Sequence, residues 1–160
     1  AMSITIYTDG SSRGNPGPGG WGAVVVNGND VREMGGREDH TTNNRMELKA
    51  VIEALNSIKT DIDTVTVYSD SQYVIKGITE WIAGWQRKGW KNSQKKDVLN
   101  RDLWEDLLAA TSEKDIKWTY VKGHALNKGN NRCDEIATSF ADNSPALLYK
   151  GLLTGYSVLK

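Results

Sequence analysis

The sequence predicts an α/β protein in which helices cover a mixed β-sheet. Three observations carry this prediction: a β-hairpin signal near the start, an alternation of strands and helices after it, and no linker or low-complexity tract in the 160 residues. A hairpin followed by strand–helix alternation is typical of layered α/β domains with antiparallel and parallel strands. One domain suits this length. We expect it to span residues 1–160, with its core at about 3–143 and a tail at 144–160 that shows no clear periodicity.

The first third of the chain predicts three strands and a helix. Residues 3–9 alternate as a strand does, and residues 10–20, with five glycines and two prolines, predict a loop or tight turn. A second strand ends at Asn27-Gly28, a strong hairpin signal, and residues 31–38 return. Residues 41–44 are good N-cap types, and residues 46–59 are helical with one apolar stripe, formed by Val51, Ala54, Leu55 and Ile58.

The same reasoning predicts the remaining helices and strands. Residues 71–90 have a helical pattern that we expect to break near Gly77 and again at Gly89. The other expected elements are strands at 64–70 and 115–122, a loop at 123–131, and helices at 101–111 and 132–141.

Composition excludes several classes of protein. Hydrophobic residues make up 38% and charged residues 25% of the chain, which is too apolar for disorder. No stretch approaches 18 consecutive apolar residues, and we expect no secretory signal at the N-terminus. A single cysteine, Cys133, excludes an intrachain disulfide and a multi-cysteine zinc site. We therefore expect a cytoplasmic, monomeric protein with no membrane partner.

Four carboxylates stand out because of their positions. Asp9 and Asp70 close two segments that match position by position, ITIYTD and VTVYSD. If these strands are parallel neighbours, the two side chains meet roughly 5 Å apart. Glu47 heads the apolar stripe of its helix, and Asp134 lies in the first turns of the last helix, where an anion is tolerated. Converging carboxylates favour hard cations such as Mg²⁺ or Mn²⁺, which typically serve phosphate chemistry.

Basic and polar residues complete a candidate nucleic-acid site. Residues 86–101 hold six cations and one acid beside Trp81 and Trp85, although the chain's net charge is zero. Cations interleaved with aromatic rings suit a nucleic-acid platform. His124, in a glycine-rich loop, has a side chain suited to proton transfer. Short polar side chains near the carboxylates can bond to sugar hydroxyls and phosphates: Asn15, Thr42, Asn43, Asn44 and Gln72.

Together, six motifs in order resemble type 1 ribonuclease H, most closely the stand-alone bacterial enzyme. They are YTDGS (7–11), GNPGPGG (14–20), TTNNRMEL (41–48), SDSQYV (69–74), WTYVKGH (118–124) and NRCDE (131–135). The resemblance runs from about residue 4 to about residue 141. It implies a five-stranded mixed sheet of order 3-2-1-4-5 with helices on both faces. It also implies endonucleolytic hydrolysis of the RNA strand of RNA–DNA hybrids, leaving 5′-phosphate and 3′-hydroxyl ends.

The resemblance also assigns residues. It implies two Mg²⁺ ions, with Mn²⁺ as a possible substitute, held by Asp9, Glu47, Asp70 and Asp134, and a mobile histidine, His124, that assists proton transfer or product release. A basic handle at residues 81–96, including Trp81, Trp85 and Lys88, would grip the DNA strand. Other hybrid contacts would fall on Asn15, Thr42, Asn43, Asn44, Gln72 and Asn100. The chain departs from bacterial relatives at Arg13, where many carry cysteine. The arginine adds a charge to the expected loop at residues 10–20.

Three other hypotheses about the function remain open. Another enzyme of this fold, such as a transposase, integrase or Holliday-junction resolvase, would keep the carboxylates but lack the tryptophan-rich basic handle. A non-catalytic hybrid-binding module would be expected to lack a carboxylate, and none of the four is missing. A structural domain with a hard-cation site would bind metal without cleaving nucleic acid.

Overall fold

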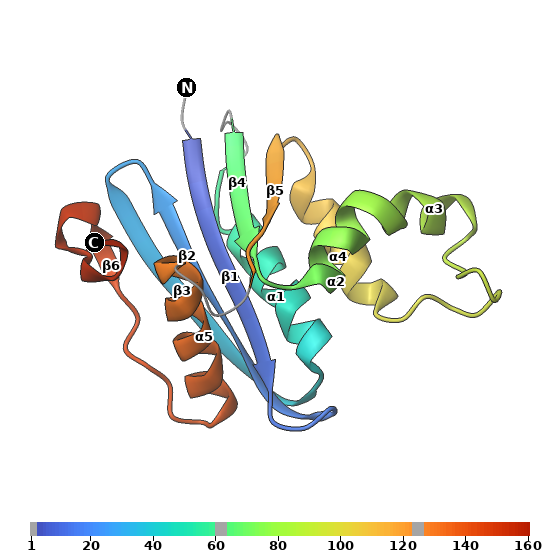
Figure 1. The fold of residues 1–160 in the computed structure, drawn as a ribbon, viewed down its shortest axis with the longest axis horizontal. Helices are drawn as coiled ribbons and strands as arrows, with labels where there is room; N and C mark the ends of the chain where they lie inside the picture. The colour runs from blue at the N-terminus through green and yellow to red at the C-terminus, as the bar shows by residue number, and fades with distance from the viewer. Residues whose placement is uncertain (1–2, 60–63, 123–126) are drawn as a thin grey trace.

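The computed structural model describes residues 3–59, 64–122 and 127–160, which form a six-stranded sheet with helices on both faces (Figure 1). The strand order is β5-β4-β1-β2-β3-β6. β1 is parallel to β4, and β4 to β5, whereas the β1–β2, β2–β3 and β3–β6 pairs are antiparallel. The strands are β1 (Ser3–Ser12), β2 (Gly17–Asn27), β3 (Asp30–Thr41), β4 (Thr64–Ser69), β5 (Ile116–Tyr120) and β6 (Lys150–Leu152).

The mixed α/β sheet and the order of its first five strands agree with the prediction. The sixth strand, β6, comes from the tail that the sequence left unassigned, and it extends the β3 edge. The glycine-rich segment at 10–20 is another difference. We expected a loop there, but β1 continues to Ser12 and β2 begins at Gly17, because the glycines let the paired strands pass close beneath two helices.

The described residues form five α-helices: α1 (Asn43–Asn56), α2 (Gln72–Lys76), α3 (Ile82–Arg87), α4 (Arg101–Thr111) and α5 (Lys128–Ala141). α3 projects away from the sheet (Figure 1). α1 begins earlier than predicted, because the hydroxyl of Thr42 accepts the backbone N–H of Arg45 and caps the helix. The expected break at Gly77 is instead a π-helical turn, Gly77–Trp81, that joins α2 to α3. A Cβ on Gly77 would lie 2.0 Å from the Trp104 ring, so glycine serves close packing here.

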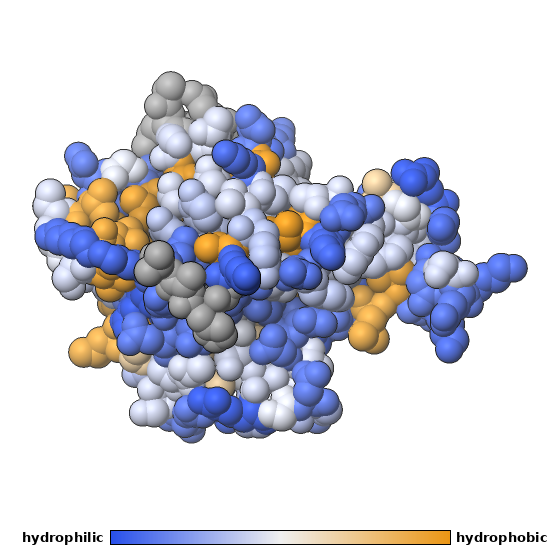
Figure 2. All heavy atoms as spheres, viewed as in Figure 1, coloured by the Kyte–Doolittle hydropathy of each residue, from blue (hydrophilic) through white to orange (hydrophobic). Residues whose placement is uncertain are grey.

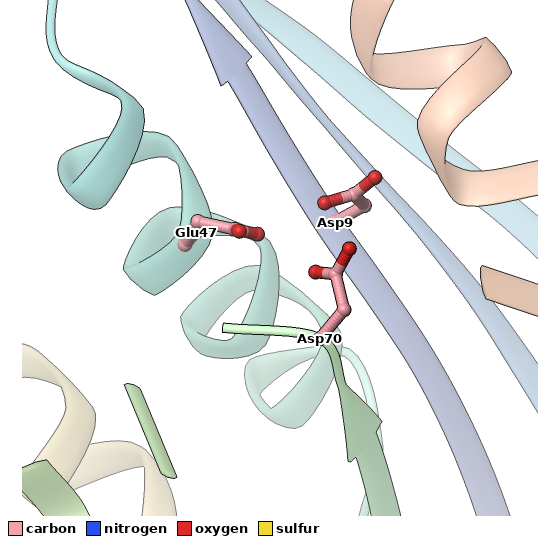
Figure 3. A group of neighbouring side chains, drawn as sticks. All are labelled: Asp9, Glu47 and Asp70. Carbon is pink, nitrogen blue, oxygen red and sulfur yellow. The ribbon is translucent and has the colours of Figure 1, made fainter. Parts of the chain in front are cut away.

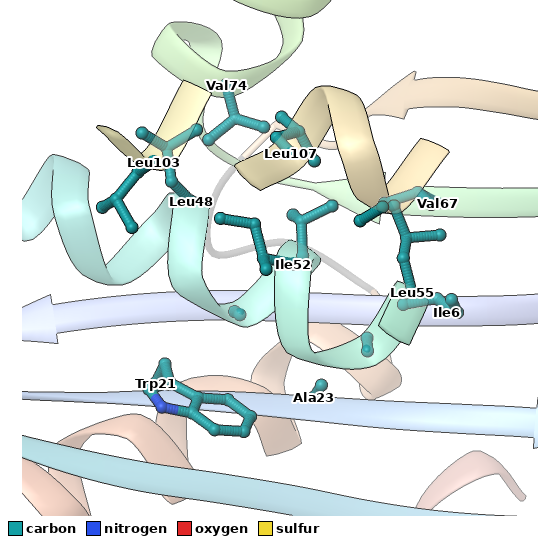
Figure 4. Packing of buried hydrophobic residues seen from close by; sticks show 14 of the residues in the cluster. Ile6, Trp21, Ala23, Leu48, Ile52, Leu55, Val67, Val74, Leu103 and Leu107 are labelled. Atoms are coloured by element: carbon teal, nitrogen blue, oxygen red, sulfur yellow. The ribbon is translucent and has the colours of Figure 1, made fainter. Parts of the chain in front are cut away.

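One face of the sheet packs against α1 and α4 to form the main core (Figure 4). Alternate residues of β1 and β4, among them Ile6 and Val67, point into it and are fully buried. They meet the apolar stripe of α1, which includes Leu48 and Leu55. Burial on this scale stabilises each large side chain by about 1.5–3 kcal/mol relative to exposure. The core therefore holds α1, and with it Glu47, firmly against β1.

The opposite face packs against α5 and the tail. A buried ionic group joins them: the Arg132 guanidinium in α5 donates to both carboxylate oxygens of Glu33 in β3, at 2.7 and 3.0 Å. Glu33 also accepts from the backbone N–H of Tyr149 at 2.8 Å and from the Tyr156 hydroxyl at 2.5 Å. Two 3₁₀ turns, Leu153–Gly155 and Ser157–Leu159, follow β6. The tail is thus bound to both β3 and α5.

Candidate metal and nucleic-acid site

Three carboxylates from three elements converge at one edge of the sheet (Figure 3). Asp9 lies in β1, Glu47 in α1 and Asp70 directly after β4, and one carboxylate oxygen from each lies within 4.8 Å of the others. Asp9 and Glu47 are buried, at 5% and 6% exposure. The structure therefore brings together three of the four acids that the sequence singled out.

The position of Asp9 differs in one respect from the prediction. We expected it to end its strand, but β1 runs on to Ser12, paired with β2. What ends near Asp9 is the parallel pairing with β4, whose last pair is Thr8 with Ser69. Asp70 follows immediately on β4, so both carboxylates still lie where the β1–β4 ladder stops.

Close packing between β1 and α1 places Glu47 beside Asp9. A Cβ on Gly10 would lie 2.3 Å from the backbone nitrogen of Glu47 and 2.4 Å from the carbonyl carbon of Met46. Real side chains are not accommodated at such distances, so only glycine allows this approach. The YTDG motif therefore supplies both a ligand and the space that the neighbouring ligand needs.

Burial and neighbouring negative charge make Asp9 and Glu47 poor anions in the metal-free protein. Burial, followed by the negative charge of Asp70, raises the pKa of Asp9 to about 8. Burial and the charges of Asp9 and Asp70 raise the pKa of Glu47 well above its usual value. The backbone N–H of Gly10 offsets part of this effect by donating to Asp9 at 2.9 Å. Such a group is stabilised either by protonation or by a cation.

The oxygens available here suit a hard divalent cation. Glu47 Oε1 and Asp70 Oδ1 are buried and have no hydrogen-bond partner among the described residues. A buried acceptor without a partner costs free energy that a metal ion would recover. All the donors are carboxylate oxygens, which Mg²⁺ and Mn²⁺ prefer, whereas zinc sites usually include nitrogen or sulfur ligands. The residues therefore fit a carboxylate-bound hard cation.

Asp134, the fourth acid, lies near the group but outside it. It is exposed on α5, and its charge contributes to raising the pKa of Asp9. The helix begins at Lys128, earlier than the predicted start at 132, so Asp134 lies in its second turn. The helix-terminus argument for Asp134 is therefore wrong, since the dipole effect is limited to the first turn.

The predicted hybrid contacts lie on two surfaces next to the carboxylates. Asn15 and Asn43 adjoin, because the Asn15 side chain accepts the backbone N–H of Asn43 at 3.1 Å, and Asn44 is exposed beside them. On the other side, Gln72 is exposed at the start of α2 and donates to the Tyr120 hydroxyl at 3.5 Å. Asn43, Asn44 and Gln72 are therefore exposed near the carboxylates.

Arg45 is a cation that the sequence reading overlooked, although it stands in the TTNNRMEL motif. Its guanidinium donates to both oxygens of Asp102 and to the Asn100 side chain at 3.3 Å. Asn100 in turn donates to the Tyr73 hydroxyl at 3.1 Å. Thr42 caps the same helix by accepting the backbone N–H of Arg45. The charge of the Arg45 guanidinium is offset by Asp102, as that of Arg13 is by Asp142.

The basic handle projects from one side of the molecule (Figure 1). Trp81 is 37% exposed, whereas Trp85 and Trp90 pack against the core. The rings of Trp81 and Trp85 are 5.9 Å apart, and those of Trp85 and Trp104 are 5.4 Å apart. Trp85 is therefore mainly a packing residue that anchors the handle, and Trp81 offers the exposed aromatic surface.

Fewer cations are free than the sequence count suggests. Lys91 pairs with Asp97, and Arg101 pairs with Glu105 at 2.8 Å while stacking on Trp90. The cations of the handle without an ion pair among the described residues are Arg87, Lys88, Lys95 and Lys96, all exposed. In Figure 2 this side of the molecule is a largely hydrophilic projection with a hydrophobic patch on its lower edge.

Arg13 does not add a free charge to its loop. Its guanidinium forms two hydrogen bonds with Asp142 just beyond α5, at 2.6 and 2.7 Å. The predicted histidine, His124, lies outside the described residues. Within the described part of the chain, no helix combines the length and apolar character needed to cross a membrane.

Comparison with known proteins agrees with this geometry. The family model for RNase H matches residues 1–142. A ribonuclease H from Cyanothece sp. is 56% identical over 138 residues, which cover 85% of this chain and 87% of that protein. A ribonuclease H from Pelobacter propionicus is 52% identical over 134 residues, covering 84% of this chain and 82% of that protein.

Solved structures show the same fold. LC9-RNase H1, described as a type 1 RNase H with the type 2 active-site motif, superimposes with a TM-score of 0.81 at 30% identity, over 94% of this chain and 78% of that one. LC11-RNase H1, solved in complex with an RNA/DNA hybrid, superimposes with a TM-score of 0.67 at 26% identity, over 88% and 98% of the two chains. With a family match over most of its length and relatives more than half identical, this chain belongs to the ribonuclease H family and is an endoribonuclease.

Proposed function

We propose that this endoribonuclease cleaves the RNA strand of RNA–DNA hybrids, with two Mg²⁺ ions, or Mn²⁺ in their place, held by Asp9, Glu47, Asp70 and Asp134. The observation that carries the proposal is the carboxylate group itself. Its buried oxygens lie within 4.8 Å of one another, and two of them have no hydrogen-bond partner among the described residues. The hybrid-bound LC11-RNase H1 shares the fold, which supports this substrate.

The proposed chemistry is hydrolysis of a phosphodiester. A pair of bound metal ions would activate a water molecule and stabilise the leaving oxygen. Attack on phosphorus with departure of the 3′ oxygen leaves a 5′-phosphate and a 3′-hydroxyl. Asp9, Glu47 and Asp70 would hold the ions, and Asp134 would add a ligand from α5. His124 is proposed to transfer a proton or assist product release.

Discrimination for hybrids follows from the surfaces beside the carboxylates. A hybrid differs from duplex DNA by the 2′-hydroxyls of one strand, which are displayed in a shallow minor groove. We assign recognition of the RNA strand to Asn15, Asn43, Asn44 and Gln72, whose amides can donate to and accept from hydroxyls. Glu47 can accept from the 2′-hydroxyl next to the scissile phosphate.

The DNA strand is assigned to a separate set of residues around Arg45 and the handle. Thr42 and Asn100 would contact one of its phosphates, and Arg45 holds the Asn100 side chain at 3.3 Å. Trp81, Trp85 and Lys88 in the handle would contact the same strand farther along, with the exposed cations supplying most of the salt-dependent affinity. A pure RNA duplex would fail to fit both surfaces, because its second strand cannot adopt a deoxy-type geometry.

An end-labelled cleavage assay tests the proposal. RNA–DNA hybrid, RNA–RNA duplex and DNA–DNA duplex are incubated in Mg²⁺ with the wild type and with Asp70→Asn. We expect cutting of the RNA strand of the hybrid alone, with a loss of activity of at least about 10²-fold in the variant, since removal of one electrostatic stabiliser typically costs about 10²–10³ in kcat. Binding of hybrid without cutting in either metal would instead indicate a binding module.

A further inference from the structure

We propose that Asn130 is a positioning residue for the carboxylates, because its side-chain amide holds together the two strand ends that carry Asp9 and Asp70. The inference rests on the proposed function and deepens it. Asn130 fell inside a segment that the sequence predicted to be a loop, but it lies in the first turn of α5 and is 8% exposed.

The Asn130 amide contacts β1 and β4 where their parallel pairing ends. Nδ2 of Asn130 donates to the backbone carbonyl of Thr8 at 3.0 Å and to that of Tyr68 at 3.4 Å. Thr8 directly precedes Asp9, and Tyr68 stands two residues before Asp70. The parallel ladder of β1 and β4 stops at the pair of Thr8 with Ser69. Beyond that pair, no ladder bond controls the distance between the carboxylates.

The chemistry of the side chain agrees with this role. An NH₂ group supplies two hydrogens from one atom, one for each carbonyl oxygen. The Thr8 hydroxyl also donates to the Tyr68 carbonyl, at 3.2 Å, so the amide reinforces a contact at this point. Oδ1 of Asn130 is left buried, with no hydrogen-bond partner among the described residues. A buried acceptor without a partner lowers stability. Stability alone therefore does not account for an amide at this position, whereas bridging the two strand ends does.

The start of α5 holds the amide in place. Asn127 caps the helix by accepting the backbone N–H of Asn130 at 3.0 Å. Gly129 packs so closely on the Tyr7 ring that a Cβ would lie 2.4 Å from it. The Tyr7 ring is itself stacked on that of Tyr68, with centroids 5.2 Å apart. The first turn of α5 is thus seated on the same two strands that its amide bridges.

The same helix carries the fourth proposed ligand. Asp134 lies four residues after Asn130, and residues at this spacing share one side of a helix. The amide therefore also fixes α5, and Asp134 with it, relative to Asp9 and Asp70. Residues that support metal ligands without touching the metal typically change metal affinity 10–100-fold when replaced.

The test is metal binding by the protein without nucleic acid. Mn²⁺ is titrated into the wild type and Asn130→Ala, and the free ion is followed by electron paramagnetic resonance. We expect at least 10-fold weaker binding in the variant. In hybrid cleavage, we expect a higher Mg²⁺ requirement and a lower kcat, with KM for the hybrid unchanged.

A matched control separates positioning from general stability. Ile136→Val alters a fully buried side chain of the same helix, six residues after the amide, that packs against Gly22 and Gly35 rather than against the ends of β1 and β4. It should lower Tm and leave Mn²⁺ affinity as in the wild type. If Asn130→Ala does not fold, Asn130→Ser keeps one donor and should show an intermediate loss of affinity.

The outcomes distinguish this inference from the proposed function. Wild-type Mn²⁺ affinity in a folded Asn130→Ala protein would overturn the positioning role alone. A wild-type protein that binds no Mn²⁺, or binds it equally well after Asp70→Asn, would overturn the metal site itself and with it both proposals.

Discussion

Asp9 is unfavourable for folding when ionised, although it is one of the three carboxylates that converge at the candidate site. It is buried beside Glu47 and Asp70, and its pKa is raised to about 8 by burial and by the charge of Asp70. A carboxyl with a higher pKa in the folded than in the unfolded protein binds its proton more tightly when folded. Stability is then greatest at low pH and falls as the pH rises through the folded pKa. The metal-free site therefore destabilises the protein at neutral and basic pH.

Asp9→Asn should remove the loss of stability that ionisation of Asp9 causes. In EDTA, we expect the wild type to lose unfolding free energy between about pH 4 and pH 8, and the variant to lose less over the same range. At pH 8 the variant should be more stable by at least about 1.4 kcal/mol, the equivalent of one pKa unit. Urea unfolding at several pH values measures both effects.

An exposed carboxylate provides the control for this prediction. Asp142 pairs with Arg13, and that guanidinium lowers the pKa of Asp142, the opposite direction to Asp9. Asp142→Asn should leave stability nearly unchanged, because an exposed ion pair contributes little to folding. Parallel pH profiles for the wild type and Asp9→Asn would contradict the raised pKa of Asp9.

At the scale of elements, the site depends on how closely helices approach the sheet. Gly10 allows α1 to reach β1, and Gly20 allows α5 to reach β2, where a Cβ would lie 2.2 Å from the carbonyl oxygen of Ala137. These contacts are backbone to backbone, so no side-chain rearrangement can relieve them. The carboxylates meet because α1 and β1 are packed as closely as two backbones can be.

Gly10→Ala should therefore push α1 away from β1. We expect a loss of stability of about 1–3 kcal/mol, the usual cost of overpacking, together with weaker Mn²⁺ binding, because Glu47 moves with the helix. Urea unfolding and metal titration of the same preparation measure both quantities.

Gly84→Ala is the matched control. Gly84 lies inside α3. Outside the backbone of its own helix, the nearest heavy atom to an added Cβ would be Nη2 of Arg87, at 3.8 Å. Alanine is the better helix former by about 1 kcal/mol, so this variant should be as stable as the wild type or more so. Unchanged metal affinity in Gly10→Ala would show that the close approach does not position Glu47.

At the scale of the whole molecule, Glu33 connects the sheet, α5 and the C-terminal tail. It is 4% exposed and receives hydrogen bonds from Arg132, Tyr149 and Tyr156. Burial opposes ionisation of Glu33, but the hydrogen bonds from Arg132 and the tyrosines outweigh it and lower the pKa. Arg132 stands two residues before Asp134 on α5, so this group also helps to hold the helix in place.

Glu33→Gln should destabilise the protein by about 2–3 kcal/mol at pH 7, less than the roughly 3–5 kcal/mol typical of a fully buried pair, because Arg132 is 20% exposed. The contribution of a carboxylate with a lowered pKa is present above its unfolded pKa and lost as the pH falls through the folded one. Urea unfolding should therefore show a smaller difference at pH 3 than at pH 7. An equal difference at both values would contradict this account.

Much of the fold could be predicted from local patterns. The alternation in residues 4–9 and 65–70 predicts two strands of similar environment, and the structure places them side by side and parallel. The stripe that begins at Glu47 predicts a helix face against the core, and that face is buried. Both signals depend on period and hydrophobicity, which a single sequence displays directly.

Local patterns failed where partners distant in sequence decide the structure. Residues 10–12 and 17–20 are strand rather than loop, because the β1–β2 and β2–β3 pairings override the weak strand preference of glycine. Residues 128–131 are helical because Asn127 caps the helix and Gly129 fits the Tyr7 ring. The tail has no periodicity from which its structure could be predicted. Its structure depends on pairing with β3 and on hydrogen bonds to Glu33.

The sequence by itself determined most strands and helices, three carboxylates that converge at the sheet edge and the family that these motifs resemble, because residue chemistry and spacing are local properties. Only the tertiary structure decided that Asp9, Glu47 and Asp70 share a space of less than 5 Å, that Arg13 is neutralised by Asp142, and that the tail completes the sheet. Those features depend on contacts between residues up to 129 positions apart, and no local pattern encodes such distances.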